Sequence, residues 1–258
     1  MHRSAKSLRR QEQREMLALA EMPLARKAAA EAIGMALLLS TVVGSGIMAE
    51  RLSGGSNAIA LLANAIATGG GLVALILALG PISGAHLNPA VTLVSAIQGE
   101  FGWREIPAYV GAQVAGALLG VALAHAMFGL PAFSVSTHVR SGVAQVLAEG
   151  VATFGLLLVI WGCSRGHRAA LSFAVASYIT AAYWFTSSTS FANPAVTIAR
   201  SLTNTFSGIR PQDVPGFLVG EALGTTAAVL FIRWLMAPRK SLRAARRSAS
   251  SGPELPNG

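Results

Sequence analysis

Long apolar runs alternate with short polar segments along most of this 258-residue chain. Runs long enough to cross a hydrocarbon layer of about 30 Å predict transmembrane helices. We place six of them, at 28–49, 58–79, 106–127, 143–163, 169–187 and 215–236. Two shorter apolar stretches, 88–97 and 193–203, can cover only about half of that thickness at ~1.5 Å per residue. The pattern predicts an all-α membrane protein with six transmembrane helices and two re-entrant half-helices.

Composition agrees with a membrane location, and the charges indicate the topology. Apolar residues make up 53% of the chain and charged residues 12%, whereas about a quarter of a soluble domain is charged. If both termini are cytoplasmic, 16 of the 20 Lys and Arg residues lie on the cytoplasmic side, and this bias indicates that orientation. We expect the protein in the plasma membrane, or in the inner membrane of a bacterium. Segments 1–27 and 237–258 are then basic cytoplasmic tails, the second expected to be disordered. Their charge is expected to meet anionic lipid rather than nucleic acid.

The chain contains an internal repeat. The sequence His86–Leu93 (HLNPAVTL) returns 105 positions later as Phe191–Ile198 (FANPAVTI). The repeats extend over about 28–127 and 143–236, and each has three spans. Because three is an odd number, the second repeat must insert upside down relative to the first, and the functional site of such a protein lies at the repeat interface near the midplane.

Each half-helix begins at an Asn-Pro-Ala tripeptide, in which Asn can cap the helix and Pro is tolerated at its first position. The two copies are Asn88-Pro89-Ala90 and Asn193-Pro194-Ala195. Inversion of the repeat brings both helix N-termini, each equivalent to about half a positive charge, to the same point. This predicts a pore whose centre repels cations and offers two amides to a neutral solute. The preceding segments 80–86 and 186–190 are expected to be extended, with carbonyls available to the pore.

Over residues 28–236 the chain resembles the aquaporin, or major intrinsic protein, family. The resemblance rests on the sequence Ser83–Thr92 (SGAHLNPAVT), on the second tripeptide, and on the paired carboxylates Glu31 and Glu149. It implies passive permeation of water or small uncharged solutes, through one pore in each subunit of a homotetramer. The sequence shows no catalytic constellation, cofactor motif or metal-ligand spacing, so we expect neither an enzyme nor a bound cofactor or metal.

The resemblance also locates the narrow outer part of the pore, where this chain departs from the usual pattern. Most family members have an arginine directly after the second tripeptide, and here that residue is Val196. Spacing from the tripeptides places the other three filter positions at Thr68, Ala181 and Ser190. Water-selective members have Phe and His at the first two of these positions. The four residues of this chain predict a wide, rather apolar ring without a fixed charge.

A one-residue gap in the second loop would put Ala182 and Phe191 in the filter instead of the last two of those residues. A wide ring should admit solutes larger than water, such as glycerol or the trihydroxylated metalloid acid arsenite. Bacterial aquaporin-like proteins linked to arsenic resistance resemble this chain in having Val here, followed by Thr-Ile-Ala-Arg-Ser. We therefore predict a channel for arsenite or glycerol, with water as a further permeant. A strict water channel is the alternative.

Two polar residues near the tripeptides each have two interpretations. Arg200 lies one helical turn beyond Val196 and could supply positive potential in the outer vestibule. It could instead be an interfacial arginine whose charge reaches the membrane surface. His86 could be a pH switch or a pore-lining polar group, and the family resemblance favours pore lining.

Glu31 and Glu149 occupy matching positions in the first and fourth spans. Carboxylates inside a membrane can carry protons, which would make the protein a proton-coupled secondary transporter. Their symmetric placement favours another role, in which they accept hydrogen bonds from the extended loops that lead into the half-helices.

Overall fold

The structure is a computed structural model that describes residues 22–237. Most of the two predicted tails, 1–27 and 237–258, therefore lies outside the described residues. Within 22–237 the chain forms eight α-helices and three short 3-10 helices, with no strand. Five of these helices are long and apolar enough to cross a membrane. The predicted all-α class is confirmed.

The two halves of the chain contain the same series of helices. The first half consists of α2 (Leu24–Leu52), α3 (Asn57–Ser83), α4 (Pro89–Ile97) and α5 (Ile106–Met127). The second half consists of α6 (Val143–Gly166), α7 (Leu171–Phe185), α8 (Pro194–Arg200) and α9 (Val214–Leu235). The 3-10 helices are Trp103–Glu105, Arg168–Ala170 and Pro211–Asp213, and they precede α5, α7 and α9.

Among the helix boundaries that differ from the prediction are the start of α2 and the end of α7. α2 begins at Leu24 rather than at residue 28, because polar residues continue the helix beyond the apolar run; one of them, Lys27, is buried and pairs with Glu105 at 3.7 Å. α7 has only 15 residues and ends before Thr186, so it is shorter than the predicted span 169–187. Hydropathy alone does not mark either boundary, since the first depends on a distant carboxylate and the second on the loop that follows.

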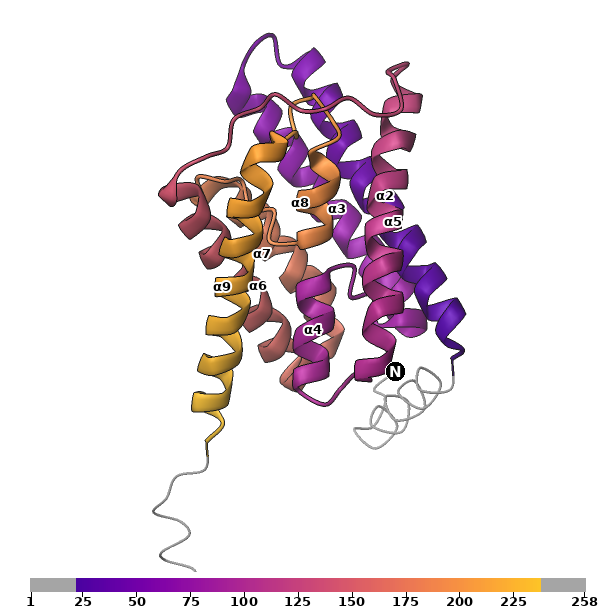
Figure 1. Ribbon diagram of the computed structural model, residues 1–258, viewed down its shortest axis with the longest axis vertical. Helices are drawn as coiled ribbons and strands as arrows, with labels where there is room; N and C mark the ends of the chain where they lie inside the picture. Colours follow the sequence, from indigo (N-terminus) through magenta and orange to yellow (C-terminus); the bar gives the residue numbers. More distant parts are fainter. Residues whose placement is uncertain (1–21, 238–258) are drawn as a thin grey trace, which may run out of the picture.

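The long helices surround the two half-helices (Figure 1). α2 packs against α5, and α6 packs against α9 in the same way, while α3 and α7 join the two halves. α4 and α8 come from opposite ends and contact each other near the middle. The start of α2 and the end of α9 lie at one end of the molecule, which we call the terminal end; the opposite end is the distal end.

Glycines allow the symmetric helix pairs to approach closely. A Cβ atom on Gly116 of α5 would lie 2.1 Å from the carbonyl oxygen of Ala32 in α2. At the matching place in the second half, a Cβ on Gly224 of α9 would lie 2.3 Å from the carbonyl oxygen of Gly150 in α6. Neither position can accept a side chain unless the backbone moves, so the small residues serve packing within one chain.

The loop before the first half-helix differs from the expected extended segment 80–86. α3 continues through Pro81 as far as Ser83 and stops at Gly84, which has a φ of 86° and donates its N–H to the carbonyl of Gly80. Pro81 lies in the last turn, where its missing N–H removes one helix hydrogen bond. Only the part from Gly84 onward is therefore non-helical, whereas the second loop leaves its helix at Thr186.

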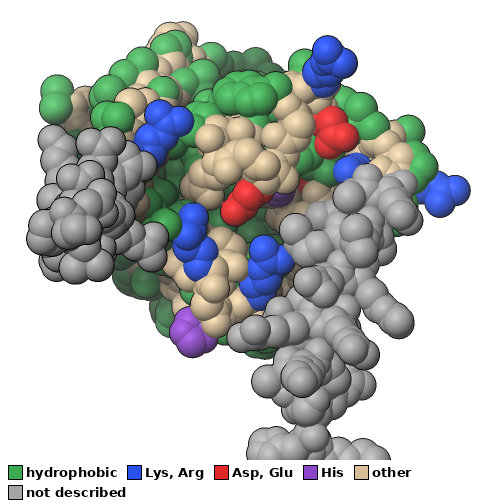
Figure 2. Space-filling view, turned by 90° about the horizontal axis from the view of Figure 1, so that it is seen from below, with side chains coloured by type: hydrophobic (Ala, Val, Ile, Leu, Met, Phe, Trp, Pro, Cys, Tyr) green, Lys and Arg blue, Asp and Glu red, His purple; other side chains and the backbone are tan. Residues whose placement is uncertain are grey.

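The outer surface is largely apolar between the two ends of the molecule. Large exposed side chains such as Ile33, Leu62 and Leu230 lie on the outward faces of three different helices. At the terminal end the surface carries many Lys and Arg side chains and few acidic ones (Figure 2). This distribution is typical of a protein surrounded by lipid, with basic side chains at one boundary.

Candidate functional site: a pore between the half-helices

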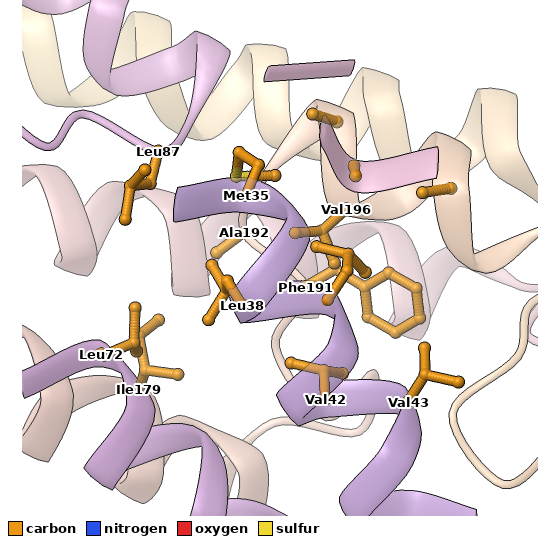
Figure 3. Close-up of a cluster of buried hydrophobic side chains, with 14 of the residues drawn as sticks. Met35, Leu38, Val42, Val43, Leu72, Leu87, Ile179, Phe191, Ala192 and Val196 are labelled. Carbon is orange, nitrogen blue, oxygen red and sulfur yellow. The ribbon is translucent and has the colours of Figure 1, made fainter. Parts of the chain in front are cut away.

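A cavity of about 580 Å³ lies inside the helices and is lined by both half-helices. Its lining runs from Glu100 and Arg168 near the terminal end, past Asn88 and Asn193, to Arg200 in the distal half. Much of its wall is apolar. Figure 3 shows the part formed by α2, α3 and α7, which contributes Leu38, Val42, Leu72 and Ile179.

The two tripeptide asparagines hold each other's loops in a reciprocal arrangement. Asn88 Nδ2 donates to the carbonyl of Ala192, and Asn193 Nδ2 donates to the carbonyl of Leu87, both at 2.7 Å. Each Asn also caps its own half-helix, because its side-chain oxygen accepts from the backbone N–H two residues later. A side-chain amide has two N–H groups, so one N–H of each asparagine is left for a molecule in the cavity.

The loops before the half-helices have an unusual backbone that repeats in both halves. Ala85 and Leu87 have φ values of 46° and 47°, and Ser190 and Ala192 have 52° and 49°. Residues other than glycine rarely adopt this left-handed region, and each instance costs on the order of 1–3 kcal/mol. All four residues line the cavity. The strain is therefore concentrated at the backbone that a permeating molecule would touch.

Glu31 holds the first of these loops. Its carboxylate accepts hydrogen bonds from the backbone N–H groups of His86 and Leu87, at 2.9 and 2.6 Å. It also accepts from the hydroxyl of Ser83 at 2.6 Å and from Nε2 of Gln113 at 2.8 Å. Glu31 is fully buried, so these four donors replace the water that its charge has lost.

Glu149 holds the second loop in the corresponding way. It accepts from the backbone N–H groups of Phe191 and Ala192, at 2.9 and 2.7 Å. Glu221 lies nearby, and its Oε1 accepts from the N–H of Asn193 and from the hydroxyl of Thr197. Neither Glu149 nor Glu221 belongs to the cavity lining, so both hold the loop from the side that faces away from the cavity.

Of the four predicted filter residues, three line the distal part of the cavity and one does not. Thr68, Ser190 and Val196 are buried and lie in the cavity wall. The prediction for Ala181 is wrong, because Ala181 is on the exposed face of α7. Tyr183, two residues later, takes its place in the wall, and its hydroxyl lies 3.2 Å from Oγ1 of Thr68.

Phe191 and His86 also lie in the cavity wall. The His86 Nδ1 is 3.1 Å from the hydroxyl of Thr92, and its ring packs against Phe101 and Tyr109. Figure 3 places Phe191 beside Val196 in the apolar cluster. The sequence suggested His86 as a pore-lining group and Phe191 as an alternative filter residue, and the structure brings both to the same cavity.

Arg200 is almost completely buried, with 2% of its surface exposed, and it belongs to the cavity wall. Its Cζ lies 3.4 Å from the centroid of the Phe191 ring, and its Nε donates to the carbonyl of Ser207. The interpretation as an arginine reaching the membrane surface is wrong, because the helix directs the side chain inward.

Sequence reasoning missed two residues of this region, Tyr183 and Arg140. Arg140 lies in the segment 128–142 between the two halves, which crosses the distal end of the molecule in Figure 1. Nothing in the sequence indicated a role for Arg140 in the pore, since an irregular segment has no periodicity that shows where a side chain points. In the same segment, burial and the neighbouring Arg140 lower the pKa of His138 below its ordinary value.

The family comparison matches the Major intrinsic protein model to residues 18–172. Aquaglyceroporin AqpS from Rhizobium meliloti (strain 1021) is 57% identical over 222 residues, which cover 86% of this chain and 95% of that protein. Probable aquaporin AqpM from Archaeoglobus fulgidus is 32% identical over 243 residues, covering 83% and 98%. Among solved structures, the aquaglyceroporin from Plasmodium falciparum has a TM-score of 0.64 and 24% identity, covering 82% of this chain and 95% of that one.

Proposed function

We propose, since the chain belongs to the major intrinsic protein family, that it is a channel for small hydroxylated solutes: glycerol and metalloid acids such as arsenite, with water as a further permeant. Members of this family are membrane channels and not enzymes, and this chain is therefore a membrane channel. The proposal concerns which solutes pass and which residues choose them.

The observation that carries the proposal is the meeting of the two capped half-helices in one cavity. Asn88 and Asn193 each keep one amide N–H that is not needed for holding the loops. A neutral solute with hydroxyl groups can accept these hydrogen bonds as it passes. A cation cannot, and it also meets the positive ends of both helix dipoles.

The residues of the distal ring favour permeation of solutes larger than water. It combines the hydroxyls of Thr68, Tyr183 and Ser190 with the apolar side chain of Val196. The Ser190 hydroxyl is buried and has no hydrogen-bond partner among the described residues, so it is available to a solute. A polyol or a trihydroxylated acid has hydroxyl groups on one side and an apolar or weakly polar surface on the other. Such a solute can contact the polar and the apolar residues of the ring. Arg200, one turn further along, supplies positive potential on the distal side.

The contacts of Glu31 and Glu149 favour a loop-holding role over proton coupling. Their oxygens already accept backbone N–H groups that have no other acceptor among the described residues. Proton uptake on either carboxylate would weaken these bonds in the loops that carry the strained residues. A cycle of protonation would thus disturb the pore itself, which argues against a secondary transporter.

We further propose that the protein lies in the plasma membrane with both termini in the cytoplasm, as a homotetramer with one pore per subunit. The basic terminal end supports this orientation. Exposed apolar side chains on the outer helix faces are compatible with both lipid and neighbouring subunits.

Uptake of glycerol, arsenite and water by vesicles containing the wild type or Val196→Arg tests the proposal. The long arginine should narrow the ring and lower glycerol and arsenite permeability roughly tenfold or more, while water permeability changes much less. Val196→Thr, which keeps the size without the charge, is the matched control and should resemble the wild type. Equal uptake of all three solutes by wild type and Val196→Arg would contradict this account of the filter.

The same vesicles separate a channel from a proton-coupled transporter. Glycerol flux through the wild type should rise in proportion to its concentration and should not change when a pH gradient is imposed. Saturable flux that follows the pH gradient would favour the transporter.

A further inference from the structure

The distal section of the pore has lost the arginine that usually follows the second tripeptide, yet two arginines lie close to it. Arg200 contacts one ring, that of Phe191, with its Cζ 3.4 Å from the centroid. Arg140 contacts the same ring, with its Cζ 5.2 Å from the centroid. The two cations come from different parts of the chain, and one aromatic side chain joins them.

Arg140 is fixed by several hydrogen bonds. Its Nε donates to the carbonyl of Gly208 at 2.8 Å, and its Nη1 donates to the carbonyl of Ser188 at 3.1 Å and lies 3.4 Å from Oγ1 of Thr189. Its backbone N–H donates to Asp213 at 2.8 Å. The guanidinium therefore links the segment 128–142 to the residues directly before Ser190, which lines the pore.

Neither guanidinium forms an ion pair with a carboxylate among the described residues, although the charge of Glu149 attracts both. Within residues 22–237 the ion pairs are Lys27–Glu105 and Arg210–Asp213, and neither includes Arg140 or Arg200. Glu149, behind the same loop, gives its oxygens to backbone N–H groups and does not line the cavity. The positive charge therefore faces the pore side of the loop, through Arg200 directly and through Arg140 across the ring.

We propose that Arg140 is a specificity-determining residue of the pore, which together with Arg200 and Phe191 restores cation exclusion without narrowing the ring at Val196. The usual filter arginine both narrows the pore and carries charge. In this chain the two effects are separated. Val196 leaves the ring wide, and the positive charges of Arg140 and Arg200 lie outside the ring. The inference rests on the proposed channel function and explains how a wide filter can pass larger neutral solutes without leaking Na⁺.

Conductance of Na⁺ and permeability to glycerol, measured on full-length protein in the same lipid, test this inference. Removing a unit charge close to the permeation path, at an effective dielectric constant of ~20, should raise Na⁺ conductance on the order of tenfold relative to glycerol permeability in Arg140→Gln. Arg140→Lys keeps the charge and should stay within about threefold of the wild type. If Arg140→Gln does not assemble, Arg140→Met, which keeps an apolar stem beside Phe191, replaces it.

Arg51→Gln is the matched control. Arg51 lies at the distal end, stacks on Phe128 with its Cζ 5.0 Å from the centroid, and does not line the cavity. Its replacement removes the same charge and a similar ring contact and should leave Na⁺ conductance unchanged. The inference is overturned if Arg140→Gln excludes Na⁺ as the wild type does. It is also overturned if Arg140→Lys leaks as much as Arg140→Gln, since Arg140 would then only hold the loop. A wild type that passes neither glycerol nor water would instead refute the proposed function.

Discussion

The two halves of the molecule share a backbone frame, but at a corresponding buried polar position α5 has Gln113 whereas α9 has Glu221. Gln113 donates to Glu31 at 2.8 Å and to the hydroxyl of Thr92 at 3.0 Å. Glu221 cannot donate when ionised, so its hydrogen bonds run the other way, and it accepts from Thr197 and from the N–H of Asn193. The same loop geometry is thus reached with an amide in one half and a second carboxylate in the other.

This difference accompanies a difference in charge. Two arginines lie near the loop of the second half, Arg140 from the connecting segment 128–142 and Arg200 from α8, and both are close to the ring of Phe191. The first half has His86 beside the aromatic rings of Phe101 and Tyr109 instead. Inverted symmetry therefore positions the loops of both halves. Residues outside this symmetry, such as Arg140 and Arg200, add positive charge to the distal half.

Replacing the amide of Gln113 by a carboxylate should have the largest effect on stability. Gln113→Glu would bring a second carboxylate to about 2.8 Å from Glu31. Since Glu31 has no ion pair among the described residues, this should destabilise the protein by about 4 kcal/mol. The melting temperature of the detergent-solubilised protein is the measurement.

Glu221→Gln is the matched exchange in the other half. Its accepting oxygen would remain, and Oε2 of Glu221 has no hydrogen-bond partner among the described residues, so the change should cost less than ~1 kcal/mol. A larger loss for Glu221→Gln than for Gln113→Glu would reverse our reading of the asymmetry.

The shared frame predicts equal effects at the two glycine contacts. Gly116→Ala and Gly224→Ala should each destabilise the protein by about 2 kcal/mol, because the new Cβ atoms would meet backbone oxygens of the facing helices. Thermal unfolding of both variants checks this. Gly111→Ala, at a position with open space around it, is the control and should not be destabilised. Unequal losses would show that the two helix pairs are not equivalent.

The smallest effect concerns the distal ring, which sets the second half apart. Tyr183→Phe removes the contact between the tyrosine hydroxyl and Thr68 and should cost about 1 kcal/mol. It should also lower the preference for glycerol over water in vesicle swelling, because a polar group leaves the wall. Ala181→Ser serves as the control, since Ala181 faces outward. If Ala181→Ser changed selectivity and Tyr183→Phe did not, the assignment of Tyr183 to the wall would be wrong.

Patterns that depend on neighbouring residues could be predicted from the sequence. The apolar runs locate the long helices, and the Asn-Pro pairs locate the starts of α4 and α8, because capping is decided within one turn. The buried carboxylates Glu31 and Glu149 could be paired by symmetry. The filter position on α7 could not be found by counting from Asn193, since the loop from Thr186 to Ala192 contains left-handed residues that change how far the chain advances.

The sequence by itself therefore determined the helical membrane class, the inverted repeat and the meeting of Asn88 with Asn193. Only the tertiary structure decided that Tyr183 rather than Ala181 faces the pore, that Arg200 points inward, and that Arg140 reaches the same ring from a distant segment. The physical reason is that helix formation and capping are local, whereas the direction of a side chain in an irregular loop depends on hydrogen bonds to residues far along the chain, as Arg140 makes to Ser188 and Gly208.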